Sequence, residues 1–131
     1  LGVPLNSEGC AAHRFRRIYI LVSRATYSAA VNFARLVKLG NAHTVLVGEE
    51  TGSPGDGHSA EILITYKLPY SGLLFEIPLV QVQFNPLVPK QEKGRGLLPD
   101  IVSAETPADF LSGRDAQLEA VSELMQKTVE P

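Results

Sequence analysis

The sequence predicts an α/β fold with a parallel βαβ unit, an added antiparallel hairpin and helices near its C-terminal end. Two short apolar runs, at residues 18–22 and 44–47, flank a segment with helical periodicity. A strand, a helix and a second strand in this order form a βαβ unit, whose crossover is right-handed and whose strands are parallel. Two alternating runs, at residues 60–68 and 74–84, then predict the hairpin.

The size and composition are those of a folded domain with a single core. The chain has 131 residues, of which 44% are apolar and 20% charged. Its formal net charge of −2 argues against nucleic acid as a partner. No apolar run approaches the roughly 18 residues that a membrane span needs. A single cysteine, Cys10, excludes an internal disulfide and a multi-cysteine zinc site, and we expect no metal or cofactor.

The first half of the chain divides clearly into segments. Residues 1–16 predict a loop or tail, and the β-branched run at residues 18–22 predicts a strand buried on both faces of a sheet. From Ser28 the pattern becomes helical, and Gly40 ends the helix. Six apolar residues fall on one broad face, which predicts the core side of this helix: Ala29, Ala30, Phe33, Ala34, Leu36 and Val37.

The middle of the chain alternates loops with strands. Residues 48–59 form a Gly-rich acidic loop before the hairpin. Pro78 within the second hairpin run indicates an edge strand or a bulge, because proline has no N–H to donate. Residues 85–99, with three prolines and two glycines, predict a long loop.

The C-terminal part carries a helix start and a second helix. Thr106 is a good N-cap, Pro107 suits the first helical position, and Asp109 faces the positive end of the helix dipole. Gly113 interrupts this helix. The last helix is predicted over residues 115–127, with an apolar stripe expected to face the core: Leu118, Val121, Leu124 and Met125.

Ser28 is the most informative residue, because it lies where the chain leaves a strand and enters a helix. Backbone N–H groups at a helix N-terminus have no intrahelical partner. A nucleophilic serine there has a ready oxyanion site, since the Ala29 amide can donate to a developing negative oxygen. The alternative is that Ser28 only caps the helix, because serine is among the best N-cap residues.

Three blocks support the catalytic interpretation: VSRATYSAAVNFA, TVLVGEETGSPG and GRGLLPDIVSAETPADFLSGRD, which together span about residues 17–127. In order and spacing they resemble the C-terminal processing peptidase family, also called tail-specific proteases. The resemblance implies a crotonase-like (ClpP/crotonase) core, with residues 17–131 as the C-terminal part of a single peptidase catalytic domain. It implies that Ser28 holds the nucleophile position and that the Ala29 amide belongs to the oxyanion hole.

Two further pairs match the family's motifs. Gly48 and Glu49 match the Gly-Glu that ends the second strand. Pro99 and Asp100 match the Pro-Asp that precedes a closing strand at residues 101–103. We expect Asp100 to make structural hydrogen bonds to turn amides rather than to take part in chemistry.

The general base is where the sequence departs from one branch of the family. That branch uses a Ser–Lys dyad, with the lysine in the Gly-rich loop. Pro54 falls near the expected lysine here, and the loop contains none. The sequence is therefore closer to the Ser–His–Glu branch, similar to the tricorn protease core, in which the histidine precedes the nucleophile strand. His13 does not match a catalytic histidine motif. The chain starts with Leu1 and its only methionine is Met125, so we expect a fragment whose base lies in a missing N-terminal segment.

Three other residues remain as alternatives for the base and its orienting acid. His58 lies in a loop that should approach the site, so it is a candidate base or a solvated loop histidine. His43 precedes a strand, where a surface position is expected. In the Ser–His–Glu branch of the family, a carboxylate from the loop before the Pro-Asp motif orients the base. Glu92 is the acid nearest to that position here, and the alternative is that it is a solvated loop glutamate.

The sequence therefore leads to three hypotheses about function. The first is a serine endopeptidase that hydrolyses polypeptides. The second is a non-catalytic ligand- or peptide-binding module on the same fold, because interphotoreceptor retinoid-binding protein resembles this family and binds small apolar ligands. The third is an inactive, oligomerising piece, with a homo-oligomer formed through exposed sheet edges. The resemblance also implies a bacterial, extracytoplasmic (periplasmic or secreted) location.

Overall fold

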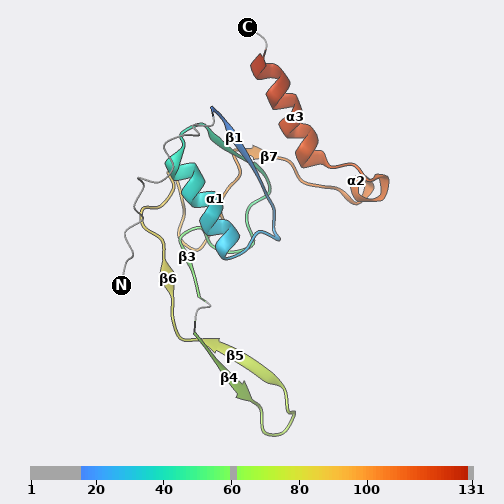
Figure 1. The fold of residues 1–131 in the computed structure, drawn as a ribbon. Helices are drawn as coiled ribbons and strands as arrows, with labels where there is room; N and C mark the ends of the chain where they lie inside the picture. The colour runs from blue at the N-terminus through green and yellow to red at the C-terminus, as the bar shows by residue number, and fades with distance from the viewer. Residues whose placement is uncertain (1–15, 60–61, 130–131) are drawn as a thin grey trace.

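The chain forms a mixed α/β structure (Figure 1). The computed structural model describes residues 16–59 and 62–129, so the predicted N-terminal tail, with Cys10 and His13, lies outside the described residues apart from Arg16. The elements in chain order are β1 (Ile18–Val22), α1 (Ala29–Gly40), β2 (Thr44–Gly48), β3 (Gly57–His58), β4 (Leu63–Lys67), β5 (Leu74–Pro78), β6 (Val82–Gln83), β7 (Ile101–Val102), α2 (Pro107–Ser112) and α3 (Ala116–Val129).

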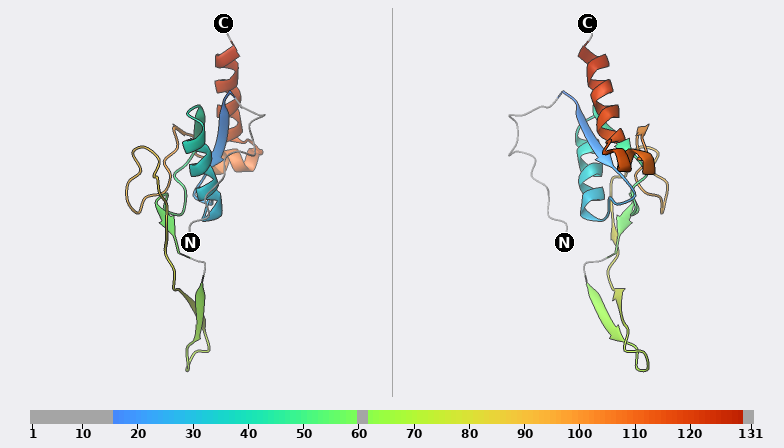
Figure 2. Two further views of the ribbon diagram at one scale, coloured as in Figure 1. Left: turned by 60° about the vertical axis from the view of Figure 1, so that its left-hand side comes forward. Right: turned by 90° about the vertical axis from the view of Figure 1, so that its right-hand side faces the viewer.

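A three-stranded parallel sheet forms the centre of the molecule. Its order is β1-β2-β7, and Ile18 pairs with Thr44 while Val47 pairs with Ile101. The predicted βαβ unit is confirmed, since β1 and β2 are adjacent, parallel and joined by α1. The predicted closing strand is also confirmed as β7, although it is only two residues long. Figure 2 shows α1 and α3 on opposite sides of β1.

The central strand is the most buried one. In β2 only Val45 is half-buried and the other four residues are buried. The prediction that the first strand is buried on both faces is wrong. β1 lies at the edge of the sheet, Leu21 is exposed, and Val22 alone is fully buried. An apolar run indicates a strand, but its burial depends on which neighbours cover it.

The predicted core face of α1 is wrong in part. The buried residues of this helix are Val31, Ala34 and Arg35. Of the six apolar residues expected on the core face, four are exposed: Ala29, Ala30, Phe33 and Leu36.

Arg35 explains why α1 is rotated from the predicted orientation. Its guanidinium donates from Nη1 to the carbonyl oxygen of Pro86 at 2.6 Å and lies 4.5 Å from the centre of the Phe84 ring. The segment that follows the hairpin therefore packs on the Arg35 side of the helix. An arginine can occupy such a buried place when its donors are paired and its charge faces an aromatic ring.

The core is built partly from loop residues. Its buried cluster joins the strands and α1 to the long loop over residues 85–99: Val22, Val31, Ala34, Leu46, Val88 and Leu97. That loop is confirmed as a segment without helix or strand, apart from an isolated bridge between Pro54 and Gly96. Because both of its ends enter the core, the loop is held against the sheet.

The predicted antiparallel hairpin is confirmed as β4 and β5, with Leu63 opposite Pro78. All ten residues of the two strands are exposed, and the hairpin extends away from the sheet and helices in each view (Figures 1 and 2). The second predicted run is not continuous to Phe84. β5 ends at Pro78, which supplies no backbone donor, and the chain then forms β6, which pairs with β3.

The C-terminal helices start as predicted but pack less than predicted. Thr106 and Asp109 form a reciprocal capping box with Pro107 in the first turn, and Gly113 ends α2 with a φ of 70°. In α3, Val121 is buried and Leu124 is half-buried.

The core stripe predicted for α3 is wrong for two of its four residues. Leu118 and Met125 are exposed. Seven residues apart, they share one side of the helix. Gln117 and Val121 share another side, and the amide of Gln117 reaches the Val22 carbonyl in β1 at 3.4 Å. This side faces the sheet.

Candidate functional site

A tight turn between β1 and α1 positions Ser28. The Thr26 N–H donates to the Ser23 carbonyl at 2.9 Å, and the Ser23 N–H donates to the Thr26 hydroxyl at 3.0 Å. Ser28 then adopts φ 49° and ψ −116°. Residues with a side chain rarely occupy this region, and such strain concentrates at functional positions.

Ser28 occupies the N-cap position of α1 without acting as a cap. Its side chain makes no capping hydrogen bond. Its backbone N–H donates to the Ser53 hydroxyl at 2.8 Å, and the Gly52 N–H donates to the Thr26 carbonyl at 3.1 Å. These two bonds fasten the turn to the Gly-rich loop. The interpretation of Ser28 as a simple helix cap therefore does not describe this geometry.

The Ala29 amide is a free donor beside Ser28. Ala29 is the first residue of α1, and within the described part of the chain its N–H has no hydrogen-bond partner. The next amide, of Ala30, already donates to the Tyr27 carbonyl at 3.0 Å. A free N–H at the positive end of a helix can stabilise a negative oxygen.

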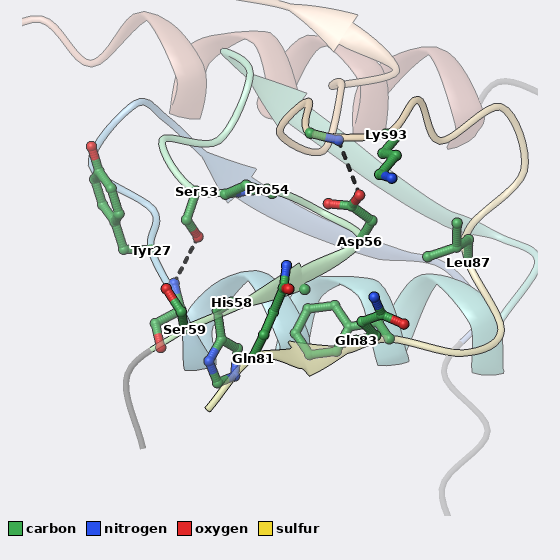
Figure 3. Close-up of a pocket in the computed structure, with 14 residues that line it drawn as sticks. Tyr27, Ser53, Pro54, Asp56, His58, Ser59, Gln81, Gln83, Leu87 and Lys93 are labelled. Carbon is green, nitrogen blue, oxygen red and sulfur yellow. Dashed lines mark hydrogen bonds between the residues drawn. The ribbon is translucent and has the colours of Figure 1, made fainter. Parts of the chain in front are cut away.

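Ser28 lines a pocket of about 720 Å³ between this turn, the Gly-rich loop and the long loop (Figure 3). Polar side chains that could act on a ligand are Ser28, Ser53, Asp56, His58 and Lys93, while Tyr27, Pro54, Phe84 and Leu87 supply apolar surface. The pocket thus combines a hydroxyl, an imidazole, a carboxylate and an amine with an apolar wall.

His58 reaches this pocket from β3. Its strand pairs with β6, and the two strands are so close that a Cβ on Gly57 would lie 2.1 Å from the Val82 carbonyl oxygen. The His58 ring is edge-on to the Phe84 ring with 5.5 Å between their centres. Its Nδ1 is buried and has no hydrogen-bond partner among the described residues. No carboxylate of the described residues therefore accepts a hydrogen bond from this nitrogen.

Asp56 and Lys93 lie together at the end of the pocket opposite His58 and Ser59 (Figure 3). An Asp56 carboxylate oxygen accepts the Gly94 N–H at 3.0 Å, which joins the Gly-rich loop to the long loop. Sequence reasoning missed Asp56, Ser53 and Lys93 as pocket residues. Two loops without periodicity carry them, and only the pairing of those loops brings them together.

Glu92 does not line this pocket. It is exposed, its carboxylate is 3.9 Å from the Arg95 guanidinium, and it borders a second, smaller cavity of about 180 Å³. The structure thus brings Ser28 and His58 to one pocket and leaves Glu92 outside it. His43 is exposed, as predicted.

Asp100 has the structural role predicted for it, with a different partner. One of its carboxylate oxygens accepts the Leu46 N–H at 2.8 Å and also contacts the Lys38 amine. It therefore ties α1 to a strand amide of β2, where turn amides were expected. Gly48 is fixed by close contact, because at φ 130° a Cβ would lie 2.0 Å from the Val22 carbonyl oxygen.

The Gly-rich loop is held by charge as well as by backbone bonds. Both oxygens of Glu50 accept hydrogen bonds from Arg95, at 2.8 and 2.7 Å, and one also accepts the Gly96 N–H at 2.9 Å. The hydrogen bond from Arg95 lowers the pKa of Glu50 to about 2. The Thr51 hydroxyl accepts the buried Leu97 N–H at 2.8 Å. These bonds fasten the Gly-rich loop to the long loop, and both loops contribute residues to the pocket.

Over residues 16–59 and 62–129, no three side chains of histidine, cysteine, aspartate or glutamate gather as a metal site would require. In the same part of the chain, no helix has the length and apolar character to cross a membrane.

The chain matches no protein-family model, and a comparison with curated proteins returned no match. The description of the site therefore rests on its geometry within this mixed α/β structure.

Proposed function

We propose that this chain is the catalytic part of a serine-type endopeptidase with a crotonase-like core, in which Ser28 forms an acyl-enzyme with a polypeptide substrate. The observation that carries the proposal is the strained backbone of Ser28, φ 49° and ψ −116°, at a strand-to-helix turn. A serine whose hydroxyl is not used as a cap and whose backbone is strained resembles a nucleophile held ready for attack.

The chemistry follows from the groups around Ser28. Its Oγ attacks the substrate carbonyl carbon while a base removes the hydroxyl proton. The carbonyl oxygen becomes negative, and the free Ala29 N–H is suited to stabilise it. The C–N bond then breaks and the amine leaves with the proton. Water hydrolyses the ester, releases a carboxylic acid and restores the Ser28 hydroxyl.

The base in this proposal is a histidine. His58 lines the same pocket as Ser28 and carries an imidazole there. The resemblance to tail-specific proteases favours instead a histidine from sequence that precedes β1. The same resemblance supports residues 17–131 as the C-terminal part of the catalytic domain and a bacterial, extracytoplasmic location.

Labelling with a serine-reactive fluorophosphonate tests the proposal. We expect one adduct, on Ser28, found by mass spectrometry of peptides, and none in Ser28→Ala. Ser59→Ala is the matched control, because Ser59 lines the same pocket. An adduct on another serine, or none in the longest obtainable form of the protein, would contradict a nucleophilic Ser28. Loss of labelling in His58→Ala would assign the base to His58.

The second candidate is a non-catalytic binding module on the same fold. The observation that favours it is the Nδ1 of His58, which is buried without an acceptor, so no acid orients this imidazole among the described residues. Binding of apolar peptides to the wild-type chain and equally to Ser28→Ala, with no fluorophosphonate adduct, would support this candidate.

A further inference from the structure

One face of the β4–β5 hairpin consists of large apolar side chains. Residues that stand opposite each other in an antiparallel pair point to the same face. Ile64 stands opposite Ile77, and Tyr66 opposite Phe75. The rings of Tyr66 and Phe75 touch, with 5.4 Å between their centres. The middle of this face is therefore entirely apolar.

The same face continues at both ends of the hairpin. The Leu79 N–H donates to the Ile62 carbonyl at 2.8 Å, and the Leu68 N–H donates to the Leu73 carbonyl at 2.9 Å. These bonds extend the register by one pair in each direction. We call the resulting set of four pairs the apolar hairpin face. Its eight side chains range from 38% exposed at Leu68 to 65% at Leu73.

The opposite face of the hairpin is different. It carries Thr65, Lys67 and Glu76 as well as Leu63, Leu74 and Pro78, so both charged side chains of the two strands lie on this mixed face. A strand pair whose charged side chains all lie on one face resembles a ribbon that is solvated on that side and packed on the other. An isolated two-stranded hairpin is marginally stable in water, so the apolar side requires a cover.

The size of the apolar hairpin face suits a protein interface. Eight large side chains that are each about half exposed present roughly 800 Å² of apolar surface, which is one partner's share of a standard interface. A patch of this size exceeds the roughly 300–600 Å² that the largest patch of a typical monomer covers.

We propose that this face packs against the same face of a second copy of the chain, to give a closed two-fold dimer. In a two-fold interface each face meets its own copy, so a charge near the two-fold axis would lie beside a like charge. The apolar hairpin face has no charged side chain, and its two copies can therefore pack as two ribbons about 10 Å apart. The hairpin extends away from the sheet and helices, which leaves room for the second copy (Figure 1). This inference does not depend on the proposed hydrolase activity.

Sedimentation of the wild-type chain over a dilution series tests the dimer. We expect a reversible change between the masses of one and two chains, with a Kd in or below the micromolar range for an interface of this size. The mass of a single chain at all concentrations would overturn the proposal. A series of larger assemblies would overturn it as well, because a two-fold interface is closed.

A pair of neighbouring substitutions then locates the interface. Ile64→Glu places a charge on the apolar hairpin face and should raise the Kd more than tenfold. Leu63→Glu is the matched control on the opposite face and should leave the Kd within about threefold of wild type, as surface changes usually do. Equal weakening by both variants would overturn the assignment of this face.

Mixing two variants separates loss of the interface from loss of folding. Ile64→Glu and Ile64→Lys should each be monomeric with a folded far-ultraviolet circular dichroism spectrum. Their mixture should form a heterodimer, because opposite charges then share the interface. Two folded variants that fail to associate on mixing would overturn the proposal.

Discussion

The sheet with α1 and the hairpin of β4 and β5 contain similar apolar strand residues in opposite environments. Leu46 in β2 is 1% exposed, whereas Leu74 in β5 is 65% exposed. β2 lies between two strands, and helices contact it. The hairpin pairs only with itself among the named elements. Strand propensity forms both regions, but only neighbours from elsewhere in the chain bury the first.

The largest expected effect comes from making the same substitution, leucine to alanine, in both regions. Leu46→Ala should lower the free energy of unfolding by about 2–5 kcal/mol, because it leaves a cavity in the core. Leu74→Ala, on the hairpin face that also carries Lys67 and Glu76, should lower it by less than about 0.5 kcal/mol. Urea unfolding followed by circular dichroism measures both. Similar losses in the two variants would mean that the hairpin face carrying Leu74 is buried in solution.

The next effect concerns the contact between α1 and the segment after the hairpin. Arg35→Ala leaves the Pro86 carbonyl without the donor that reaches it at 2.6 Å, and should cost about 1–3 kcal/mol of unfolding free energy. Arg35→Lys is the control, since it keeps the charge but not the planar fork that also binds Asn32. It should fall between wild type and Arg35→Ala in the same unfolding measurement. An Arg35→Ala variant as stable as wild type would contradict the structural role of this arginine.

A smaller effect is expected in α2, an exposed helix whose start is stabilised by local hydrogen bonds. The side chains of Phe110 and Leu111 in α2 are exposed, so its start depends on the capping box. Thr106→Ala should cost about 1 kcal/mol, whereas Thr106→Ser keeps the hydroxyl and should cost less. Thermal unfolding of the two variants makes the comparison. Equal losses would show that the hydroxyl does not carry the effect.

The smallest effect is expected from Glu50 and Arg95, the ion pair that joins the Gly-rich loop to the long loop. Hydrogen bonding from Arg95 lowers the pKa of Glu50 to about 2. A carboxyl whose pKa is lower in the folded state stabilises that state above its unfolded pKa of about 4.3, and this contribution is lost as the pH falls toward 2.

Glu50→Gln should therefore show a shallower loss of stability between about pH 5 and pH 2 than wild type. Arg95→Gln should have the same effect, and the double variant should add nothing to either one. Part of the acid-side decline should remain, because hydrogen bonds from Thr106 also lower the pKa of Asp109. Urea midpoints measured across this pH range provide the test. Additive effects of the two single variants would contradict a direct pair.

Local signals predicted the elements well. The strand at Ile18–Val22, the helix that ends at Gly40 and the cap at Thr106 all follow from residue type and spacing, which act within a few residues. Burial was predicted poorly. Arg35 faces the core and Phe33 faces solvent, because Pro86, which lies 51 residues further along the chain, contacts Arg35 on that side of α1. The spacing of apolar residues in α1 cannot show which side of the helix a distant segment covers.

The candidate site was also predicted only in part from the sequence. Ser28 could be found from sequence, because a strand, a serine and a helix are consecutive. The pocket around it could not, since Asp56 and Lys93 meet through pairing of two irregular loops. Whether Ser28 is a nucleophile stays a prediction. Glu92 was selected because it is the acid nearest to the position of the orienting carboxylate in the family the chain resembles, and its side chain lies outside the pocket.

The backbone of Ser28 has a consequence for how this chain would respond to selection for heat resistance. Glycine adopts φ 49° without steric penalty, so Ser28→Gly would remove a strain of about 1–3 kcal/mol. The greater freedom of glycine in the unfolded chain offsets only about 0.5–1 kcal/mol of this gain. Ser28→Gly should therefore melt at a higher temperature than wild type. A library screened for survival on heating would drift toward glycine at this position and lose the hydroxyl that the proposed mechanism uses.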